Sequence, residues 1–363
     1  MHGRARRVFL VKNVNHQSSA FRKKNHYVPC MYLKRFASSA NQVSVYRTLV
    51  SSSRVPLWKE SAISGIGYRQ HLYTRVAAGQ ETDEIEDWLS REFESPAEEA
   101  LEKATSDARL NPEDWRRLVR FLAAQDLRTP ARLLEILRDL HAKLPELLDS
   151  TLRDTIQINT AAAKRLVNIA EDKDFSEYLP VRAIVRPEPD GKTASLKLEA
   201  IAGRGMWIFA LKHLLNRTLD VLHEHRWTIL IAPPGLNWFT TDDPVVRLNY
   251  RPDHHDFRGT WGSPGSDIIL PLSPTHLLYT RIGHKPPPRG EILEQAHCRL
   301  IRKIIAEHAH RMIFAASRDE EIPAMRPRVV SDETFREETA HWQKWNGDQV
   351  AAEKRLMQPE DEI

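Results

Sequence analysis

Apolar side chains recur every three or four residues through the middle of the chain, which is the pattern of helices with one buried face. Thr82 is the expected N-cap of the first helix, and Pro96 is expected to kink or split it. Asn111 followed by Pro112 is a stronger start signal, because Asn caps helices and Pro suits their first position. A break is expected at Thr129-Pro130, after which the apolar pattern resumes from Leu133 to Leu140, and the same spacing predicts further helices over residues 151–169 and 206–225.

In the second half of the chain, short apolar runs separated by turn residues favour strands. The prolines in residues 180–191 predict a loop or a connection between subdomains there, before the strands of the second half. Near the start, residues 42–46 alternate polar and apolar side chains, and we expect them to pair with residues 67–74. The later strands are expected at 227–232, 238–241, 245–248, 268–270, 277–280 and 312–315, with a helix at 291–310.

These elements predict an α+β fold, in which a helical middle region packs with a mostly antiparallel sheet from the second half and a short N-terminal β section. We expect one domain over residues 23–317, with its helical part at about 82–225 and its sheet part at about 226–317. Residues 1–22 form a basic arm that we expect to be flexible, and residues 318–363 form an acidic C-terminal tail.

Charge adds little, because 53 Lys and Arg are balanced by 49 Asp and Glu. The basic arm is the exception, since residues 1–24 carry seven basic side chains and no acid, which suits a nucleic-acid backbone. The two cysteines, Cys30 and Cys298, are too few for a disulfide framework. With no secretory leader and no apolar run of membrane-spanning length, we expect a cytoplasmic protein without a membrane partner.

Sequence motifs exclude several enzyme classes. The chain has no dinucleotide-binding GxGxxG, no P-loop lysine, no GxSxG nucleophile elbow and no HExxH zinc motif. Nucleotide-cofactor oxidoreductases, P-loop NTPases and the common serine hydrolases are therefore not expected.

Polar residues in apolar surroundings are the remaining candidates. His26 lies before a cluster of aromatic residues, where it is either a general base or metal ligand or a hydrogen-bonded residue at the edge of the core. Gln125 and Arg128 extend the buried stripe of the helix that starts at Asn111. A buried guanidinium needs an anionic partner, so Arg128 is either an anion clamp or part of a structural ion pair.

Three carboxylates complete the set. Asp242 lies at a strand end before Asp243-Pro244, a place that suits a metal ligand or catalytic acid and equally an ordinary turn. Glu86 and Glu94 are eight residues apart on the helix expected after Thr82, so both can face the same side. On their own these two glutamates are typical of a solvated helix face.

The segment that begins Asn25-His26-Tyr27-Val28-Pro29 and ends at Phe36 resembles the opening of a family catalogued as domain of unknown function 4238. The resemblance covers about residues 23–317 and implies a bacterial-type cytoplasmic protein with no established activity. This chain has Asn25 where the family often has a second histidine, which argues against a histidine-pair metal site. The other matching segments are residues 85–86, 93–94, 121–130, 239–245, 271–274 and 313–314.

We therefore expect a polar active site, and its most economical chemistry is metal-dependent hydrolysis of phosphodiesters. The alternative is a non-enzymatic module that binds an anionic ligand, nucleic acid or a partner protein. In the first hypothesis the catalytic residues are His26, Gln125, Arg128 and Asp242. Arg128 and Tyr27 would contact the substrate, and Glu94, Asp242 and Glu86 would hold Mg²⁺ or Mn²⁺.

Overall fold

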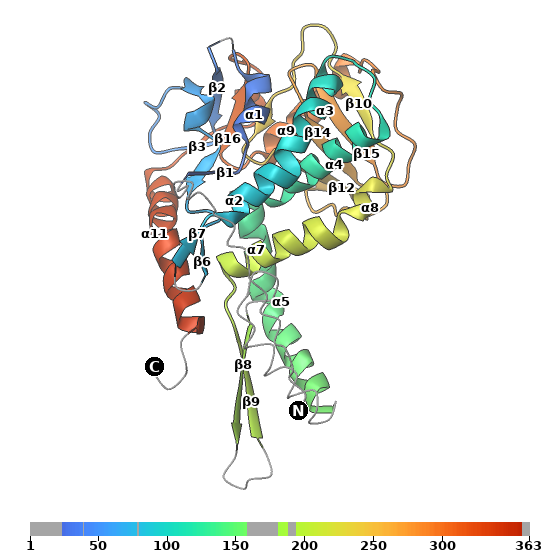
Figure 1. The fold of residues 1–363 in the computed structure, drawn as a ribbon. Helices are drawn as coiled ribbons and strands as arrows, with labels where there is room; N and C mark the ends of the chain where they lie inside the picture. Colours follow the sequence, from blue (N-terminus) through green and yellow to red (C-terminus); the bar gives the residue numbers. More distant parts are fainter. Residues whose placement is uncertain (1–23, 39, 78–79, 158–180, 188–193, 358–363) are drawn as a thin grey trace, which may run out of the picture.

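Two antiparallel sheets form the centre of the molecule in the computed structural model, which describes residues 24–38, 40–77, 80–157, 181–187 and 194–357 (Figure 1). The larger sheet has five strands, in the order β10 (Thr228–Ile231), β15 (His276–Arg281), β14 (Asp267–Pro271), β12 (Val246–Tyr250) and β13 (His255–Asp256). The smaller sheet has four, in the order β11 (Thr240–Thr241), β16 (Met312–Ala315), β2 (Gln42–Arg47) and β4 (Trp58–Ala62).

The N-terminal strands pair differently from the prediction. β2 pairs with β4 and β16, whereas the segment expected to be its partner contains β5 (Tyr68–Gln70), which pairs with β1 (Lys24–His26). Residues 181–187, expected in a loop, form a strand, in which the β-branched residues Val181, Ile184 and Val185 favour extended backbone. The remaining pairs are β3 (Leu49–Val50) with β17 (Val329–Val330), β6 (Arg75–Ala77) with β7 (Gln80–Thr82), and β8 (Val181–Pro187) with β9 (Ala194–Ala200).

The first long helical segment starts at α2 (Glu84–Leu89), passes through a π-helical turn at Ser90–Glu94 and continues as α3 (Ser95–Thr105). Thr82 is not its cap, because Thr82 ends strand β7. Pro96 lies in the first turn of α3, directly after the π-helical turn, so the helix is interrupted where the sequence predicts it.

The next helix, α4 (Pro112–Leu127), starts at the predicted cap. The side chain of Asn111 accepts from the Asp114 N–H at 2.8 Å, and the Asp114 carboxylate accepts from the Asn111 N–H at 3.0 Å, which makes a complete capping box. α5 (Pro130–Gln157) follows after Thr129, so residues 151–157 continue a helix that began earlier, and residues 158–169 lie outside the described residues.

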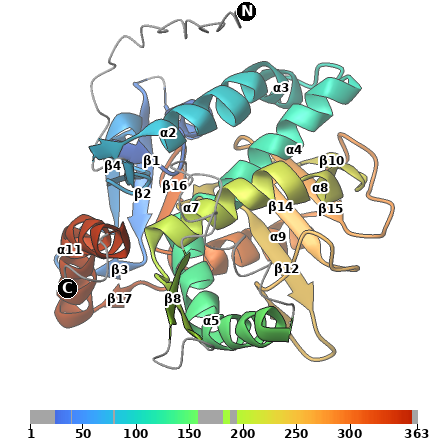
Figure 2. The same cartoon turned by 60° about the horizontal axis from the view of Figure 1, so that its bottom comes forward.

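The other helices are shorter, apart from the last. They are α1 (Cys30–Leu33), α7 (Arg204–His213), α8 (Asp220–His223), α9 (Gln295–His308), α10 (Ile322–Met325) and α11 (Asp332–Met357). A π-helical turn at Leu214–Thr218 joins α7 to α8. The acidic C-terminal segment is therefore largely helical, and α11 runs beside the N-terminal strands in Figure 2.

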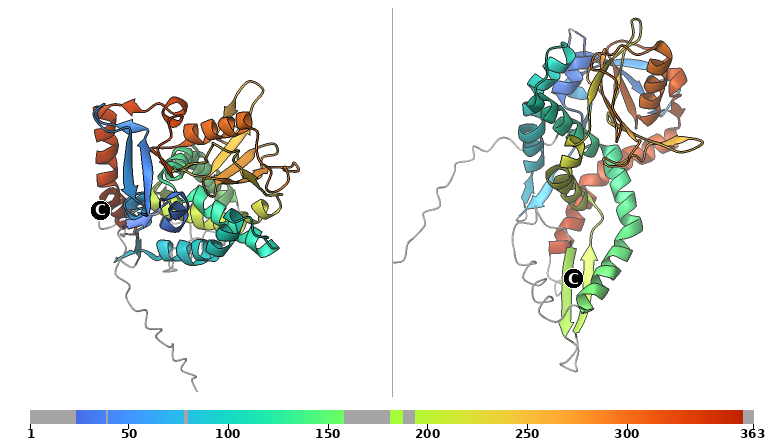
Figure 3. Two further views of the ribbon diagram at one scale, coloured as in Figure 1. Left: turned by 90° about the horizontal axis from the view of Figure 1, so that it is seen from above. Right: turned by 90° about the vertical axis from the view of Figure 1, so that its right-hand side faces the viewer.

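Strand β14 shows how the larger sheet is buried on both faces. Ile268 and Leu270 pack in an apolar cluster with α3 and α4, whereas Ile269 between them packs in a second cluster with α9. Side chains that alternate along a strand point to opposite faces, so a continuous apolar run is the expected sequence for such a strand. Figure 3 shows α3 and α4 on one side of the strands and α9 on the other.

Away from this centre, α5 and the β8–β9 hairpin extend together from the body in Figures 1 and 3. None of the helices in the described part of the chain combines the length and the apolar character needed to cross a bilayer. The observed architecture confirms the predicted α+β class, because helices and antiparallel sheets share their apolar clusters.

Candidate functional site

His26, at the end of β1, lines a cavity of about 300 Å³. The opposite wall comes from α2, the π-helical turn and α3, which contribute Glu86, Glu94 and Glu98. Cys30 from α1 also lines it. Three glutamates around one histidine make this wall acidic. We call this the His26 cavity.

Arg128 lies behind this cavity, fully buried directly after α4. Its two terminal nitrogens donate to the Glu94 carboxylate and to the backbone carbonyl of His26, and its Nε lies 3.4 Å from the Tyr73 hydroxyl. All three guanidinium nitrogens therefore have partners within the protein. This geometry does not support the substrate contact expected of Arg128 and gives it the structural ion pair that the sequence also allowed.

Gln125 supports the same segment one turn earlier on α4. Its Nε2 donates to the backbone carbonyl of Tyr27 at 2.6 Å, and the side chain is fully buried. Gln125 and Arg128 thus hold the carbonyls of two consecutive residues. Gln125 does not line the His26 cavity itself.

The imidazole of His26 is partly buried. Burial, followed by the nearby charge of Arg128, lowers the pKa of His26 below its ordinary 6.5, which keeps the ring neutral at neutral pH. Its Nε2 is buried and makes no hydrogen bond with any described residue. The backbone N–H of His26 donates to Glu86 Oε1 at 3.3 Å, so Glu86 also fixes this segment.

Asp242 is placed elsewhere. Its two carboxylate oxygens accept the backbone N–H groups of His310 at 3.0 Å and Arg311 at 2.8 Å, directly before β16. Burial raises the pKa of Asp242 to about 7. Asp242 is absent from the lining of the His26 cavity, so the geometry does not support a metal ion shared with Glu94. Within the described ranges, no group of three or more His, Cys, Asp or Glu side chains is arranged to hold a metal ion.

Tyr27 follows His26 in the chain but lines a different cavity, of about 500 Å³, between the N-terminal strands and α11. Arg47, Arg69 and Arg311 also line it, and we call it the arginine cavity. Sequence reasoning missed these three arginines, because they come from segments far apart in the chain and none stands in a recognisable motif. No local signal set Arg69 apart, since its neighbours Tyr68 and Gln70 line the same cavity.

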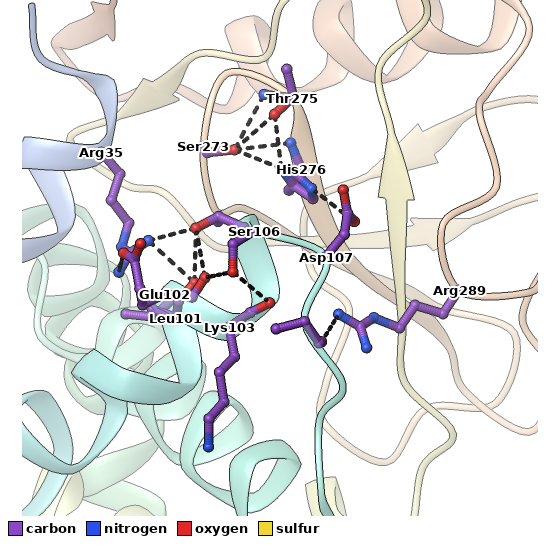
Figure 4. Close-up of polar contacts among 12 residues, drawn as sticks. Arg35, Leu101, Glu102, Lys103, Ser106, Asp107, Ser273, Thr275, His276 and Arg289 are labelled. Atoms are coloured by element: carbon purple, nitrogen blue, oxygen red, sulfur yellow. Dashed lines mark hydrogen bonds and ion pairs between the residues drawn. The ribbon is translucent and has the colours of Figure 1, made fainter.

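A wider cavity of about 1150 Å³ adjoins the His26 cavity, since the two share Cys30, Met31, Ser95 and Glu98. At its far end, Ser273 Oγ lies 3.0 Å from His276 Nδ1, and His276 Nε2 lies 3.2 Å from Asp107 (Figure 4). No local pattern in the sequence predicts that these three side chains meet.

This arrangement has the components of a serine-hydrolase triad, but its hydrogen bonds are those of a turn. Ser273 Oγ accepts the backbone N–H groups of Thr275 and His276, at 3.3 and 3.1 Å, and the Thr275 hydroxyl also contacts His276 Nδ1 at 2.8 Å (Figure 4). Ser273 therefore closes the turn that leads into β15.

The structure is thus an α+β protein in which a histidine and glutamates enclose a small cavity over a buried arginine. The family model described as a protein of unknown function, DUF4238, matches residues 24–319, and the chain belongs to that family. No curated protein and no solved structure matches the chain. The family membership confirms the resemblance seen in the sequence motifs.

Proposed function

We propose that the His26 cavity is a hydrolytic active site in which His26 is the general base, and that the bond it cleaves is a phosphodiester. The observation that carries this proposal is the His26 imidazole, neutral and with a buried Nε2 that has no partner in the described chain, beside the carboxylates of Glu86 and Glu94. A neutral imidazole held in a fixed position can take a proton from water.

In this mechanism a water oxygen attacks phosphorus while its proton moves to His26 Nε2, and the P–O bond to the leaving alkoxide breaks. The alkoxide takes up a proton from bulk water, and His26 then returns its proton to the solvent. The acidic wall repels a bare phosphate, so the substrate would enter with a divalent cation, Mg²⁺ or Mn²⁺. Mg²⁺ is commonly held by one or two carboxylates together with substrate phosphates, a role open to Glu86 and Glu94. Arg128 and Gln125 act by holding the His26–Tyr27 backbone.

The alternative is a non-enzymatic binding module. The observation that favours it is the complete use of the Arg128 guanidinium by Glu94, His26 and Tyr73, because such a buried network is also how a fold holds its parts together. On this alternative, His26 contributes to stability and not to turnover.

A cleavage assay with the full chain separates the two. We would incubate labelled RNA, labelled DNA and a chromogenic phosphodiester with Mg²⁺, with Mn²⁺ and with EDTA. His26→Gln should reduce cleavage by about 10²–10⁴-fold, with the melting temperature nearly unchanged. His254→Gln, in an exposed loop, is the matched control and should keep full activity. Absence of cleavage of all three substrates would reject the hydrolase and favour the binding module.

A further inference from the structure

We infer that the arginine cavity is a binding site for a small phosphorylated ligand, and that Glu338 of α11 occupies part of it when no ligand is bound. This inference does not depend on the proposed hydrolase, because the two cavities have no lining residue in common. About 500 Å³ is enough for a ligand the size of a sugar phosphate or a mononucleotide. The residues that carry the argument are Tyr27, Arg47, Arg69, Arg311, Glu338 and Trp342.

Strand pairing brings two of the arginines together. In the β2–β16 ladder Arg47 lies opposite Met312, the residue after Arg311, and the N–H of Thr48 donates to the Arg311 carbonyl at 3.0 Å. Arg47 and Arg311 are therefore neighbours at one end of the two central strands of the smaller sheet. Asp242 accepts the backbone N–H of Arg311 and so fixes the backbone from which the Arg311 side chain extends.

Arg69 comes from β5 and completes the group. Its guanidinium stacks 3.9 Å from the ring of Trp342 on α11, and its Nε is buried without a hydrogen-bond partner among the described residues. A planar guanidinium held against an aromatic ring keeps its outer edge available for a phosphate oxygen.

The carboxylate of Glu338 lies in the arginine cavity. It accepts from Arg311 Nε at 2.6 Å and lies 3.8 Å from Arg69. Arg47 is exposed and forms no ion pair with any residue that the structure describes. Three arginines around one carboxylate leave an excess of positive charge, and a phosphate dianion matches it better than Glu338 does. Asp242 is buried and interacts electrostatically with Arg69. Because burial disfavours the charged form of Asp242, this carboxyl does little to offset the positive charge of the arginines.

Calorimetric titration of the full chain tests this inference. Inorganic phosphate, glucose 6-phosphate and adenosine monophosphate would be titrated at low and high salt, with glucose and succinate as uncharged and carboxylate controls. We expect the phosphates to bind and the binding to weaken with salt. Comparison of the three phosphates shows whether the ligand is the free anion or a phosphate carried by a sugar or nucleotide.

Two variants place the binding in this cavity. Arg47→Ala should weaken it by about tenfold with no change in melting temperature, whereas the exposed Arg54→Ala should leave it unchanged. Glu338→Gln should tighten it severalfold by removing the competing carboxylate, and its exposed neighbour Glu337→Gln should not.

Three results would overturn the inference. They are the absence of binding by all three phosphates, binding that neither Arg47→Ala nor Glu338→Gln alters, and succinate binding as tight as that of phosphate. In none of these cases does the result depend on whether the His26 cavity cleaves phosphodiesters.

Discussion

The backbone carbonyl of His26 accepts a hydrogen bond from the guanidinium of Arg128, 102 residues later in the chain. Gln125 holds the next carbonyl, that of Tyr27, from the same helix. These contacts fix the point where the chain leaves β1, with His26 lining one cavity and Tyr27 the other. A small displacement of α4 would therefore alter both cavities.

Arg128→Ala should destabilise the protein by about 3–5 kcal/mol, because it leaves the Glu94 carboxylate and the His26 carbonyl without their buried partner. Urea unfolding measures the change. Arg116→Ala, on the exposed face of the same helix, is the control and should cost less than about 0.5 kcal/mol. Equal losses in the two variants would contradict the role assigned to Arg128.

Asn111→Ala should cost about 0.5–2 kcal/mol, because it removes the acceptor that holds the Asp114 N–H at the start of α4. Thermal and urea unfolding both report this change. Asn111→Ser keeps a side-chain oxygen at the cap and should stay close to the parent protein. If the serine variant lost as much stability as the alanine variant, the cap would not be the cause.

Asp242 should make stability depend on pH. Burial raises its pKa from 3.8 to about 7, so the folded state binds a proton that the unfolded state releases. This contribution to the free energy of unfolding is complete below about pH 4 and is lost as the pH rises through about 7. In Asp242→Asn the contribution is absent, so the advantage of the parent over the variant should be largest near pH 4. Urea unfolding from pH 4 to 8 measures it, and a constant advantage would contradict it.

The pKa of His26 should set the acidic limb of the pH–activity profile of the proposed hydrolase. Burial and the charge of Arg128 lower its pKa, so the basic form persists below pH 6.5 and activity should decline only at a more acidic pH. The measurement is kcat/KM against pH. Glu94→Gln removes a carboxylate that favours the protonated ring, so it should move this limb to still lower pH. A limb at or above pH 6.5 would argue against His26 as the base.

The local pattern of residues was enough to predict much of the secondary structure. Asn111 and Pro112 marked the start of α4, and the apolar runs of the second half became strands of both sheets. Helix caps and periodic apolar residues act over a few positions, so they can be read from the sequence directly. The α+β class follows from these elements.

The candidate site could be predicted only in part from the sequence. Arg128 and Gln125 were recognisable because polar side chains continued an apolar stripe, and a buried guanidinium must have an anionic partner. That this partner is Glu94, and that Asp242 instead holds the backbone before β16, depended on contacts between residues far apart in the chain.

The sequence by itself determined which segments become helices or strands and which polar residues had to be satisfied inside the protein. Only the tertiary structure decided their partners. It paired β2 with β4 and β16, and it gathered Arg47, Arg69, Arg311 and Glu338 around one cavity. The physical reason is that strand pairing and charge pairing depend on distances in space, which a local pattern along the chain does not contain.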